Sequence, residues 1–353
     1  ANFEEALAIR EKVQEPDHAD LAINLNNLAG VLSDLGDYAG AKIMHERALV
    51  VREKAHGPDH PATAISLNNL GLTLEELGDF AGARKHHERA LAIREKILGP
   101  DHRATAVSLN NLANITARLG DYAAAKDLHE RSVAIREKTL GPDHPDTATS
   151  LNNLAFILNQ LGDRKSARTL QERSLAINER IFGRHHPATA VTLSVLAVLL
   201  KNDGELEPAA EMLEEVVAIR EKLLGPAHPQ TAAALHSLGG VYVRQGETDR
   251  AMTIYGRARE ITEKHFAPDH HSVTSIMHSI ADLHHKLGNR REARALFERC
   301  LAASEKSYGA SHIATLKIAR SLHRLALDEN DMATAGALAE KYGAEALAAS
   351  APS

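Results

Sequence analysis

One histidine recurs along this sequence at a constant spacing of 42 residues. The recurring residues are His18, His60, His102, His144, His186, His228, His270 and His312. Zinc needs imidazole nitrogens about 2.0–2.1 Å away, whereas packed helices lie about 8–10 Å apart. Histidines that occur once in a segment long enough for two helices are too far apart to share an ion. We expect no metal site and no cofactor, and we expect each histidine to hydrogen-bond backbone in its own loop or at a helix terminus.

The sequence contains no catalytic motif that stands out. The Gly-Pro pairs are not followed by the Lys and Ser/Thr of a phosphate-binding loop, and no Gly-x-Ser-x-Gly turn occurs. Cys300 is the single cysteine and has no identifiable catalytic partner. Carboxylate pairs such as Glu75-Glu76 are typical of solvated helix faces. We therefore expect a protein that is not an enzyme.

The histidine spacing is one sign of a repeat that covers nearly the whole chain. Residues 57–98 match residues 99–140 at 26 of 42 positions without a gap. A fixed period of about 20–50 residues indicates stacked structural repeats. We predict eight repeats, with residues 1–14 as the trailing second helix of a truncated preceding repeat and 351–353 as a tail. The repeats are 15–56, 57–98, 99–140, 141–182, 183–224, 225–266, 267–308 and 309–350, and the last reads as a terminal cap.

Each repeat is predicted to contain two helices, A and B. In 57–98 the residues Ile65, Leu67, Leu70, Leu74 and Leu77 give one helical stripe. Glycine then suits the left-handed residue after helix A, and aspartate suits the N-cap of helix B. The next Gly-Pro pair ends helix B. No stretch of the sequence indicates a β-strand, so the predicted fold class is all-α.

Small and apolar residues within each repeat resemble the tetratricopeptide (TPR) pattern. In 57–98 these are Gly71, Ala83 and Ala90, with Leu67, Leu70 and Leu74 between them. The 42-residue length and the segments Leu-Asn-Asn-Leu, Ala-Ile-Arg-Glu-Lys and Gly-Pro-Asp-His-Pro are similar to the TPR domain of kinesin light chains. The resemblance implies a right-handed superhelical solenoid of antiparallel helix pairs, a TPR array, whose A helices line a concave groove. Such kinesin-light-chain grooves bind short acidic peptides that contain an aromatic residue.

Composition limits the partners and the location that we expect. The net charge is −6, with 25% charged residues, which argues against a general nucleic-acid binder. A single cysteine fits a reducing compartment, and no run of 18 apolar residues suggests a membrane span. We expect a cytoplasmic protein without nucleic-acid or membrane partners. Ala1 lies inside a helix-B pattern, so we expect an excised piece whose first apolar face is covered by another copy, through a homotypic end-to-end contact.

The asparagine pairs of the first four repeats are candidate peptide-binding residues. Asparagine is a poor interior helix former, yet it recurs at one register of helix A. Its amide can pair with the backbone of an extended peptide through donors and an acceptor. We place Asn26, Asn68, Asn110 and Asn152 in the groove, together with the second residues Asn69 and Asn111. For the second residues, bridging between neighbouring helices is an equal alternative.

Charge along the predicted groove changes from acidic to basic. Early positions include Asp34, Glu75 and Glu76, and the late candidates are His236, Arg244, His278, Lys286, Arg320 and Arg324. A basic end favours a carboxylate or an acidic peptide segment. Histidine titrates near pH 6.5, so affinity is expected to rise as pH falls if these rings meet carboxylates.

Two functional hypotheses follow from the repeat and its groove. The first is a protein-protein interaction module that binds an extended, acidic peptide segment in the concave groove. The alternative is a sensor or regulatory repeat array of a larger multidomain signalling protein. Both hypotheses depend on the helix phase, which predicts that small residues lie where helix A meets helix B. These are Gly71 and its equivalents Ala29, Ala113, Ala155, Ala197, Gly239 and Ala281, and we also predict His45, His87 and His129 as core or half-core side chains.

Overall fold

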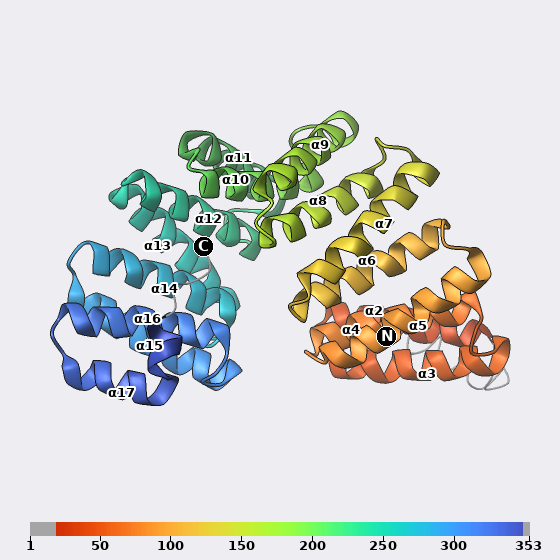
Figure 1. Cartoon of the computed structure of the whole chain (residues 1–353), viewed down its shortest axis with the longest axis horizontal. Coiled ribbons are helices and arrows are strands. Elements are labelled where there is room, and N and C mark those ends of the chain that lie inside the picture. Colours follow the sequence, from red (N-terminus) through yellow and green to blue (C-terminus); the bar gives the residue numbers. More distant parts are fainter. Residues whose placement is uncertain (1–18, 349–353) are drawn as a thin grey trace. The chain divides into compact units, whose positions relative to one another are not determined.

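The structure, a computed structural model, describes residues 19–348. These residues form α-helices joined by short turns, with no β-strand among them (Figure 1). The predictions for residues 1–14, His18 and residues 351–353 fall outside the described part. The all-α fold class is confirmed.

Helices of two kinds alternate along the chain. The A helices are α2 (Ala19–Asp34), α4 (Pro61–Glu76), α6 (Arg103–Arg118), α8 (Pro145–Gln160), α10 (Pro187–Asp203), α12 (Pro229–Gln245), α14 (His271–Lys286) and α16 (Ile313–Asp328). The B helices are α3 (Tyr38–His56), α5 (Phe80–Leu98), α7 (Tyr122–Leu140), α9 (Arg164–Phe182), α11 (Leu206–Leu224), α13 (Thr248–His265), α15 (Arg290–Tyr308) and α17 (Met332–Tyr342). A short helix, α18 (Ala344–Ala348), follows the last of them.

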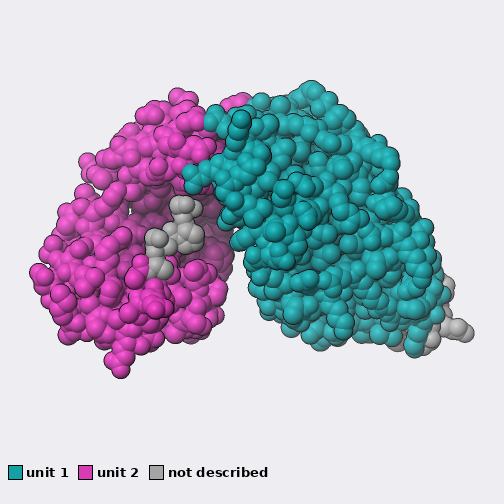
Figure 2. Space-filling model, in the orientation of Figure 1, with its two compact units in different colours: residues 1–181 teal, residues 182–353 magenta. Residues whose placement is uncertain are grey.

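The chain divides into two compact units, Ala1–Ile181 and Phe182–Ser353, which Figure 2 colours separately. We call them the N-terminal unit and the C-terminal unit. In each unit an A helix packs against the B helix of its own repeat, and that B helix packs against the next A helix. Successive A helices also touch one another within each unit. Each unit is therefore a stack of helix pairs with a continuous layer of A helices.

The recurring histidines cap the A helices. In His60 the ring Nδ1 accepts a hydrogen bond from the backbone N–H of Ala62, at 3.1 Å. The same cap occurs at His102, His144, His186, His228, His270 and His312. An N-cap side chain satisfies one of the backbone donors that the first helical turn leaves unpaired. The prediction that these histidines bind helix-terminus backbone is confirmed for all seven that the structure describes.

The turn between helices A and B follows the predicted residues closely. Helix α4 gives way to a left-handed glycine, Gly78, with φ of 79°, a conformation that glycine adopts at no steric cost. Asp79 comes next, and its Oδ1 accepts a hydrogen bond from the N–H of Gly82 at 2.9 Å. Helix α5 begins directly after this cap. The turn chemistry of two residues thus fixes where helix B starts.

Helices A and B meet closely at the predicted small residues. A Cβ added to Gly71 would lie 2.6 Å from the ring of His87, and one added to Gly239 would collide with Tyr255. The alanines at the equivalent positions are fully buried, as Ala113 illustrates. His45, His87 and His129 are 5%, 0% and 1% exposed, which confirms them as core side chains. The predicted helix phase is therefore correct.

The C-terminal end departs from the regular repeat. The sequence pattern places Gly343 inside helix B, but α17 ends there because Gly343 adopts a φ of 85°. The chain then continues as α18, whose Leu347 is 7% exposed and packs in the last hydrophobic core. The Nε of Arg320 on α16 donates to the carbonyl oxygen of Ala346, at 2.6 Å. The added helix covers apolar surface of the last repeat.

Candidate peptide-binding surface

The solvent-facing side of the A helices is the surface on which the sequence places the candidate site. We call it the A-helix surface and describe it separately for the two units. In the N-terminal unit it comprises the exposed sides of α2, α4, α6 and α8, and in the C-terminal unit those of α10, α12, α14 and α16. The helix phase confirmed above sets which side chains reach it.

Asparagine side chains join successive A helices in the N-terminal unit. The Nδ2 of Asn111 donates to the Oδ1 of Asn68 at 2.7 Å, and the Nδ2 of Asn153 donates to the Oδ1 of Asn110 at 2.9 Å. In each pair the first asparagine of one repeat accepts from the second asparagine of the next. We call these four residues the amide ladder. The bridging alternative for the second asparagine therefore describes the observed geometry, and it engages the oxygen of the first one as well.

The amide ladder changes partner at both of its ends. The Oδ1 of Asn26 meets the Nδ1 of His45 at 2.8 Å, and the Oδ1 of Asn152 accepts from the Nε2 of Gln171 at 2.8 Å. Both partners lie on helix B of the same repeat. Because His45 occupies the oxygen of Asn26, the side chain of Asn69 has no hydrogen-bond partner within residues 19–348.

The C-terminal unit keeps this cross-repeat pairing with different side chains. The Nε2 of His236 lies 2.8 Å from the Oγ of Ser279, and the Nε2 of His278 lies 3.1 Å from the Oγ of Ser321. These pairs are 43 residues apart, as in the amide ladder. An imidazole at the first position and a hydroxyl at the second replace the two amides, and the same two positions of neighbouring repeats remain paired.

Asp282, His278 and Ser321 have the order of contacts found in a catalytic triad. The Nδ1 of His278 is 3.5 Å from the Oδ2 of Asp282, and its Nε2 faces Ser321 as described above. However, His278 and Ser321 are only 5% and 8% exposed, so a substrate has little access to the hydroxyl. The contact is the ordinary cross-repeat pair, which gives it a structural explanation.

Burial sets the charge of the histidines on this surface. Desolvation, assisted by nearby Lys201 and Lys317, lowers the pKa of His236 to about 4. Desolvation also lowers the pKa of His278, against the opposing effect of Asp282. His236 is therefore neutral between pH 6 and 7.5, because its folded pKa lies well below that range. The expectation that protonation of this ring strengthens binding in that interval is wrong, since it assumed an ordinary histidine pKa.

The predicted cations of the C-terminal unit have three different surroundings. Arg320 is turned toward α18 and bonded to backbone there. Lys286 and Arg324 line one pocket, and the Nη2 of Arg324 lies 3.6 Å from the Oδ1 of Asp282. Arg244 donates to the backbone carbonyl of Lys201 on the preceding A helix. The structure thus brings together Lys286 and Arg324, and it places Arg320 elsewhere.

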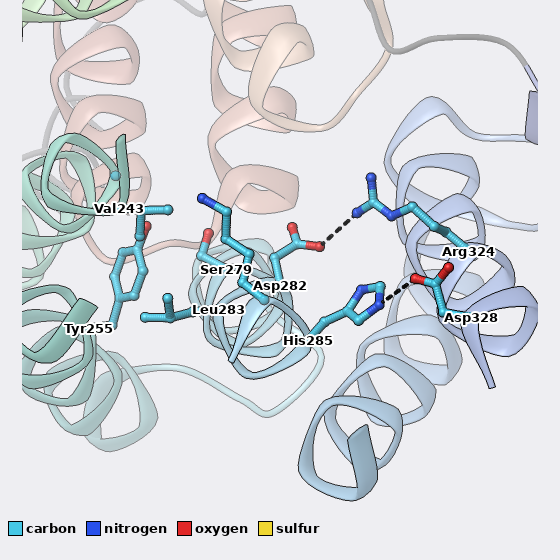
Figure 3. A pocket seen from close by; sticks show the side chains of 10 residues that line it. Val243, Tyr255, Ser279, Asp282, Leu283, His285, Arg324 and Asp328 are labelled. Carbon is cyan, nitrogen blue, oxygen red and sulfur yellow. Dashed lines mark hydrogen bonds and ion pairs between the residues drawn. The ribbon is translucent and has the colours of Figure 1, made fainter. Parts of the chain in front are cut away.

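Each unit has a pocket of similar size on its A-helix surface. The pocket in the C-terminal unit has a volume of about 470 Å³ (Figure 3), and the pocket in the N-terminal unit has a volume of about 460 Å³. The first is lined by Gly240, Val243, Tyr255, Ser279, Asp282, Leu283, His285, Lys286, Arg324 and Asp328. The second is lined by Asn26, Gly30, Ser33, His45, Asn69, Leu72, Thr73 and Glu76. We call them the Gly240 pocket and the Gly30 pocket.

The sequence interpretation missed several lining residues of these pockets. Gly30, Gly240 and Tyr255 were not among the candidates, although Asn26, Asn69, Lys286 and Arg324 were. A signal for them exists in the repeat alignment, because Gly30 and Gly240 share a position that carries Leu72 and Phe156 elsewhere. Loss of a large side chain at a solvent-facing position of helix A leaves room for a ligand.

The B helices present a surface whose charges are largely paired. Arg131 on α7 reaches Glu95 on α5 at 2.6 Å, and Arg173 on α9 reaches Glu137 on α7 at 2.6 Å. Equivalent pairs join α3 to α5 and α11 to α13. Each pair links one repeat to the next through opposite charges. The B-helix surface is therefore less suited than the A-helix surface to recognise a charged ligand.

Within residues 19–348, no group of three or more His, Cys, Asp or Glu side chains has an arrangement that could hold a metal ion. Over the same residues, no helix is both long enough and apolar enough to cross a membrane.

Comparisons with known proteins agree with the geometry of the repeat. Two family models, both described as Tetratricopeptide repeat, match this chain. One matches residues 1–54, 20–96, 68–138, 105–179, 146–222 and 203–264, and the other matches residues 273–314. The comparison with curated proteins found no significant match.

Solved structures of several repeat proteins are similar to this chain. TPR-like repeats of a Podosopora anserina protein assigned as a kinesin light chain are 30% identical, with a TM-score of 0.50 over 58% of this chain and 97% of that chain. BtubC (BKLC) from P. vanneervenii is 22% identical, with a TM-score of 0.51 over 69% of this chain and 94% of that chain. The apo form of the quorum sensor NprR from B. thuringiensis is 12% identical, with a TM-score of 0.70 over 96% of this chain and 90% of that chain. At these identities, the last two comparisons show the fold alone.

The helix pairs, the repeat length and the family matches together define a TPR solenoid. The chain belongs to the tetratricopeptide repeat family, and its repeats are of the kinesin-light-chain-like type. TPR arrays are in general non-catalytic scaffolds that bind protein or peptide partners, and the matches indicate no enzyme family.

Proposed function

We propose that this protein is an interaction module that binds an extended, acidic peptide segment on its A-helix surface. The cations of the C-terminal unit would hold the acidic part of the segment. In the N-terminal unit the amide of Asn69, which lines the Gly30 pocket, would contact a peptide on the A-helix surface of that unit. Asn68 and Asn110 would chiefly hold the A helices in register, because their oxygens already accept hydrogen bonds.

One observation carries the proposal, namely a group of like charges from three A helices of the C-terminal unit. Half-buried Lys201 lies on α10, Arg244 on α12 and Lys317 on α16. Burial, and then the charges of Arg244 and Lys317, lower the pKa of Lys201. None of the three cations has a carboxylate partner within the described residues. Like charges held together on a partly desolvated surface repel one another, and a bound anion relieves that repulsion.

Two carboxylates on the A-helix surface of the C-terminal unit already contact basic side chains. Asp282 faces Arg324 and His278, and the Oδ2 of Asp328 accepts from the Nε2 of His285 at 2.8 Å. Lys286 has no ion-pair or hydrogen-bond partner within the described part of the chain. The surplus charge on the A-helix surface of this unit is therefore positive, although the whole chain has a net charge of −6.

Fluorescence anisotropy with two matched decapeptides tests the proposal. The probes are acetylated, amidated and fluorescein-labelled, and they share one aromatic residue. One contains four Glu residues and the other has Gln in their place. We expect the Glu peptide to bind at least tenfold more tightly at low salt and to weaken with added salt, because exposed charge pairs are screened.

Variants of the chain locate the interaction. Arg244→Glu with Lys317→Glu is expected to abolish the preference for the Glu peptide. Lys222→Glu is the matched control, since Lys222 is an exposed lysine on helix B of the same unit. Equal affinities for the two peptides, or an equal loss in the control, would contradict the proposal.

A further inference from the structure

The Gly30 and Gly240 pockets occupy equivalent positions in repeats that are five repeats apart. Each pocket begins at a glycine of helix A and lies beside the residue of helix B that packs in the core, His45 or Tyr255. The next A helix then contributes corresponding residues, of which Glu76 and Lys286 are one pair. The two pockets differ in volume by only a few per cent. The repeat frame has thus produced one type of pocket twice.

The glycines that open these pockets have no packing role. Four glycines lie inside the A helices of the described chain, and two of them, Gly71 and Gly239, are required by a ring packed against them. A Cβ on Gly30 would meet no atom within 4 Å, and one on Gly240 would meet only the hydroxyl of Tyr255 at 3.6 Å. Glycine destabilises a helix interior relative to alanine. Its use where a side chain fits comfortably indicates that the open space itself is needed.

Other repeats fill the same position with side chains of many kinds. They carry Leu72, Asn114, Phe156, Val198, Asp282 and Arg324 at this register. Leu72 and Phe156 are 44% and 49% exposed. The scaffold therefore accepts a large side chain at this register, and the two glycine pockets are local exceptions.

The two pockets differ in the charged group that lacks a partner. Glu76 is exposed at the Gly30 pocket and has no cationic partner within the described residues, and Asn26 and Asn69 add neutral amides. At the Gly240 pocket Lys286 has no partner, whereas Asp282 and Asp328 are engaged by Arg324 and His285 (Figure 3). The Gly30 pocket therefore has an unpaired carboxylate, and the Gly240 pocket has an unpaired ammonium group beside two carboxylates that basic side chains already contact.

We propose that these are two side-chain selectivity pockets, of which the Gly30 pocket takes a lysine or arginine side chain and the Gly240 pocket takes an aspartate or glutamate side chain. The inference rests on the proposed peptide-binding function and adds a basic residue to the ligand that it describes. Volumes near 460–470 Å³ fall in the range of ligand sites, about 300–1,000 Å³. The apolar walls of the Gly240 pocket, Val243 and Leu283, suit the methylene groups of glutamate.

A positional peptide library tests the assignment with the whole chain. The probe is a set of acetylated, amidated decapeptides in which one position at a time is fixed as Lys, Glu or Gln, so that only side chains carry charge. The wild-type chain should prefer Lys members of the library at one pocket and Glu members at the other, each over the Gln members, and the two pockets are measured independently. Gly30→Leu should reduce the Lys preference about tenfold or more and keep the Glu preference, and Gly240→Leu should do the reverse. Glu76→Lys and Lys286→Glu should each invert the preference of their own pocket.

Val198→Leu is the matched control, because it places leucine at the same register in a repeat without a glycine pocket. It should leave both preferences unchanged. Leucine is already present at this register in Leu72, so the filled variants should fold, and a thermal melt checks this. If peptides bind and both glycine variants keep the wild-type preferences, the pocket assignment is overturned while the proposed function stands. If no peptide of the library binds the wild-type chain, the proposed function fails and the pocket assignment fails with it.

Discussion

The A-helix surfaces of the two units use one frame for different chemistry. In the N-terminal unit Asn68 and Asn111 join neighbouring A helices, and in the C-terminal unit His236 and Ser279 do so at the same spacing. Burial and the helix caps follow the same repeat in both units. Around this shared frame, the N-terminal pocket carries Glu76 and the C-terminal pocket carries Lys286. The comparison teaches that the repeat fixes positions, while side chains at a few exposed registers define what each surface recognises.

The largest effect on stability is expected from buried histidines at one core position of helix B, where the two units carry different residues. This register holds His45, His87, His129 and Gln171 in the N-terminal unit, and Leu213, Tyr255 and Phe297 in the C-terminal unit. Desolvation lowers the pKa of His45 and of His129 to about 4. In the unfolded chain these histidines bind protons near pH 6.5, whereas in the folded chain they stay neutral down to about pH 4. The free energy of unfolding is therefore highest above pH 6.5 and decreases as pH falls toward 4.

Each of these two histidines should lower the free energy of unfolding by roughly 1.4 kcal/mol for each pH unit below 6.5 in that interval. Urea unfolding between pH 7 and 4 measures the slope. Replacement of both by Gln, the residue that Gln171 provides at this register, should flatten the slope. If the double variant keeps the wild-type pH dependence, the histidines are not the titrating groups.

A somewhat smaller effect on stability is expected from overpacking the contact between helices A and B, which tests whether both units share that contact. Ala113 and Ala281 are fully buried where helix A meets helix B. Ala113→Leu and Ala281→Leu should each destabilise the protein by about 1–3 kcal/mol, because extra methylene groups overpack a dense contact. Thermal unfolding measures both. An unchanged melting temperature in either variant would show that the two units do not share this contact.

Removing one cross-repeat hydrogen bond in each unit should have a smaller effect on stability and compares equivalent contacts directly. Asn111→Ala removes the donor to Asn68, which is 8% exposed, and Ser279→Ala removes the partner of His236. Each change should cost about 1 kcal/mol, the net value of one hydrogen bond. Chemical denaturation measures the difference from the wild-type chain. A cost near zero for only one variant would show that the ladders are not equivalent.

The smallest effect is expected on the B-helix surface. Arg131→Ala breaks the exposed pair with Glu95 and should cost less than about 1 kcal/mol, since solvent screens such pairs. The same denaturation experiment at low and high salt measures it. A loss as large as that of Ala113→Leu would show that this surface contributes more to stability than its exposure indicates.

Much of the frame could be predicted from the sequence, because local residues determine it. Gly78 and Asp79 define the turn between α4 and α5, and the recurring histidines bind the backbone of the helices that they cap. These features depend on residues within a few positions of one another. The helix phase also followed from periodicity, and Gly71 therefore proved to be a close contact.

The details of the site depend on neighbouring repeats, and the sequence does not display those contacts. The oxygen of Asn68 is engaged by Asn111 of the next repeat, which requires the packed helices to be seen. The low pKa of His236 follows from its burial, which its register alone does not reveal. From the sequence alone, Gly30 could equally have been a packing glycine like Gly71. The structure distinguishes them, because a Cβ would collide with His87 at Gly71 and would meet no atom within 4 Å at Gly30.

Photo-cross-linking with a labelled peptide shows directly whether an acidic peptide binds the A-helix surface of the C-terminal unit. The probe is the acidic decapeptide described above with its aromatic residue replaced by benzoylphenylalanine, and tryptic mass spectrometry locates the cross-links on the full chain. We expect cross-links on α12, α14 and α16 that disappear with Arg244→Glu and Lys317→Glu. Cross-links confined to the B helices and unaffected by those substitutions would contradict this expectation.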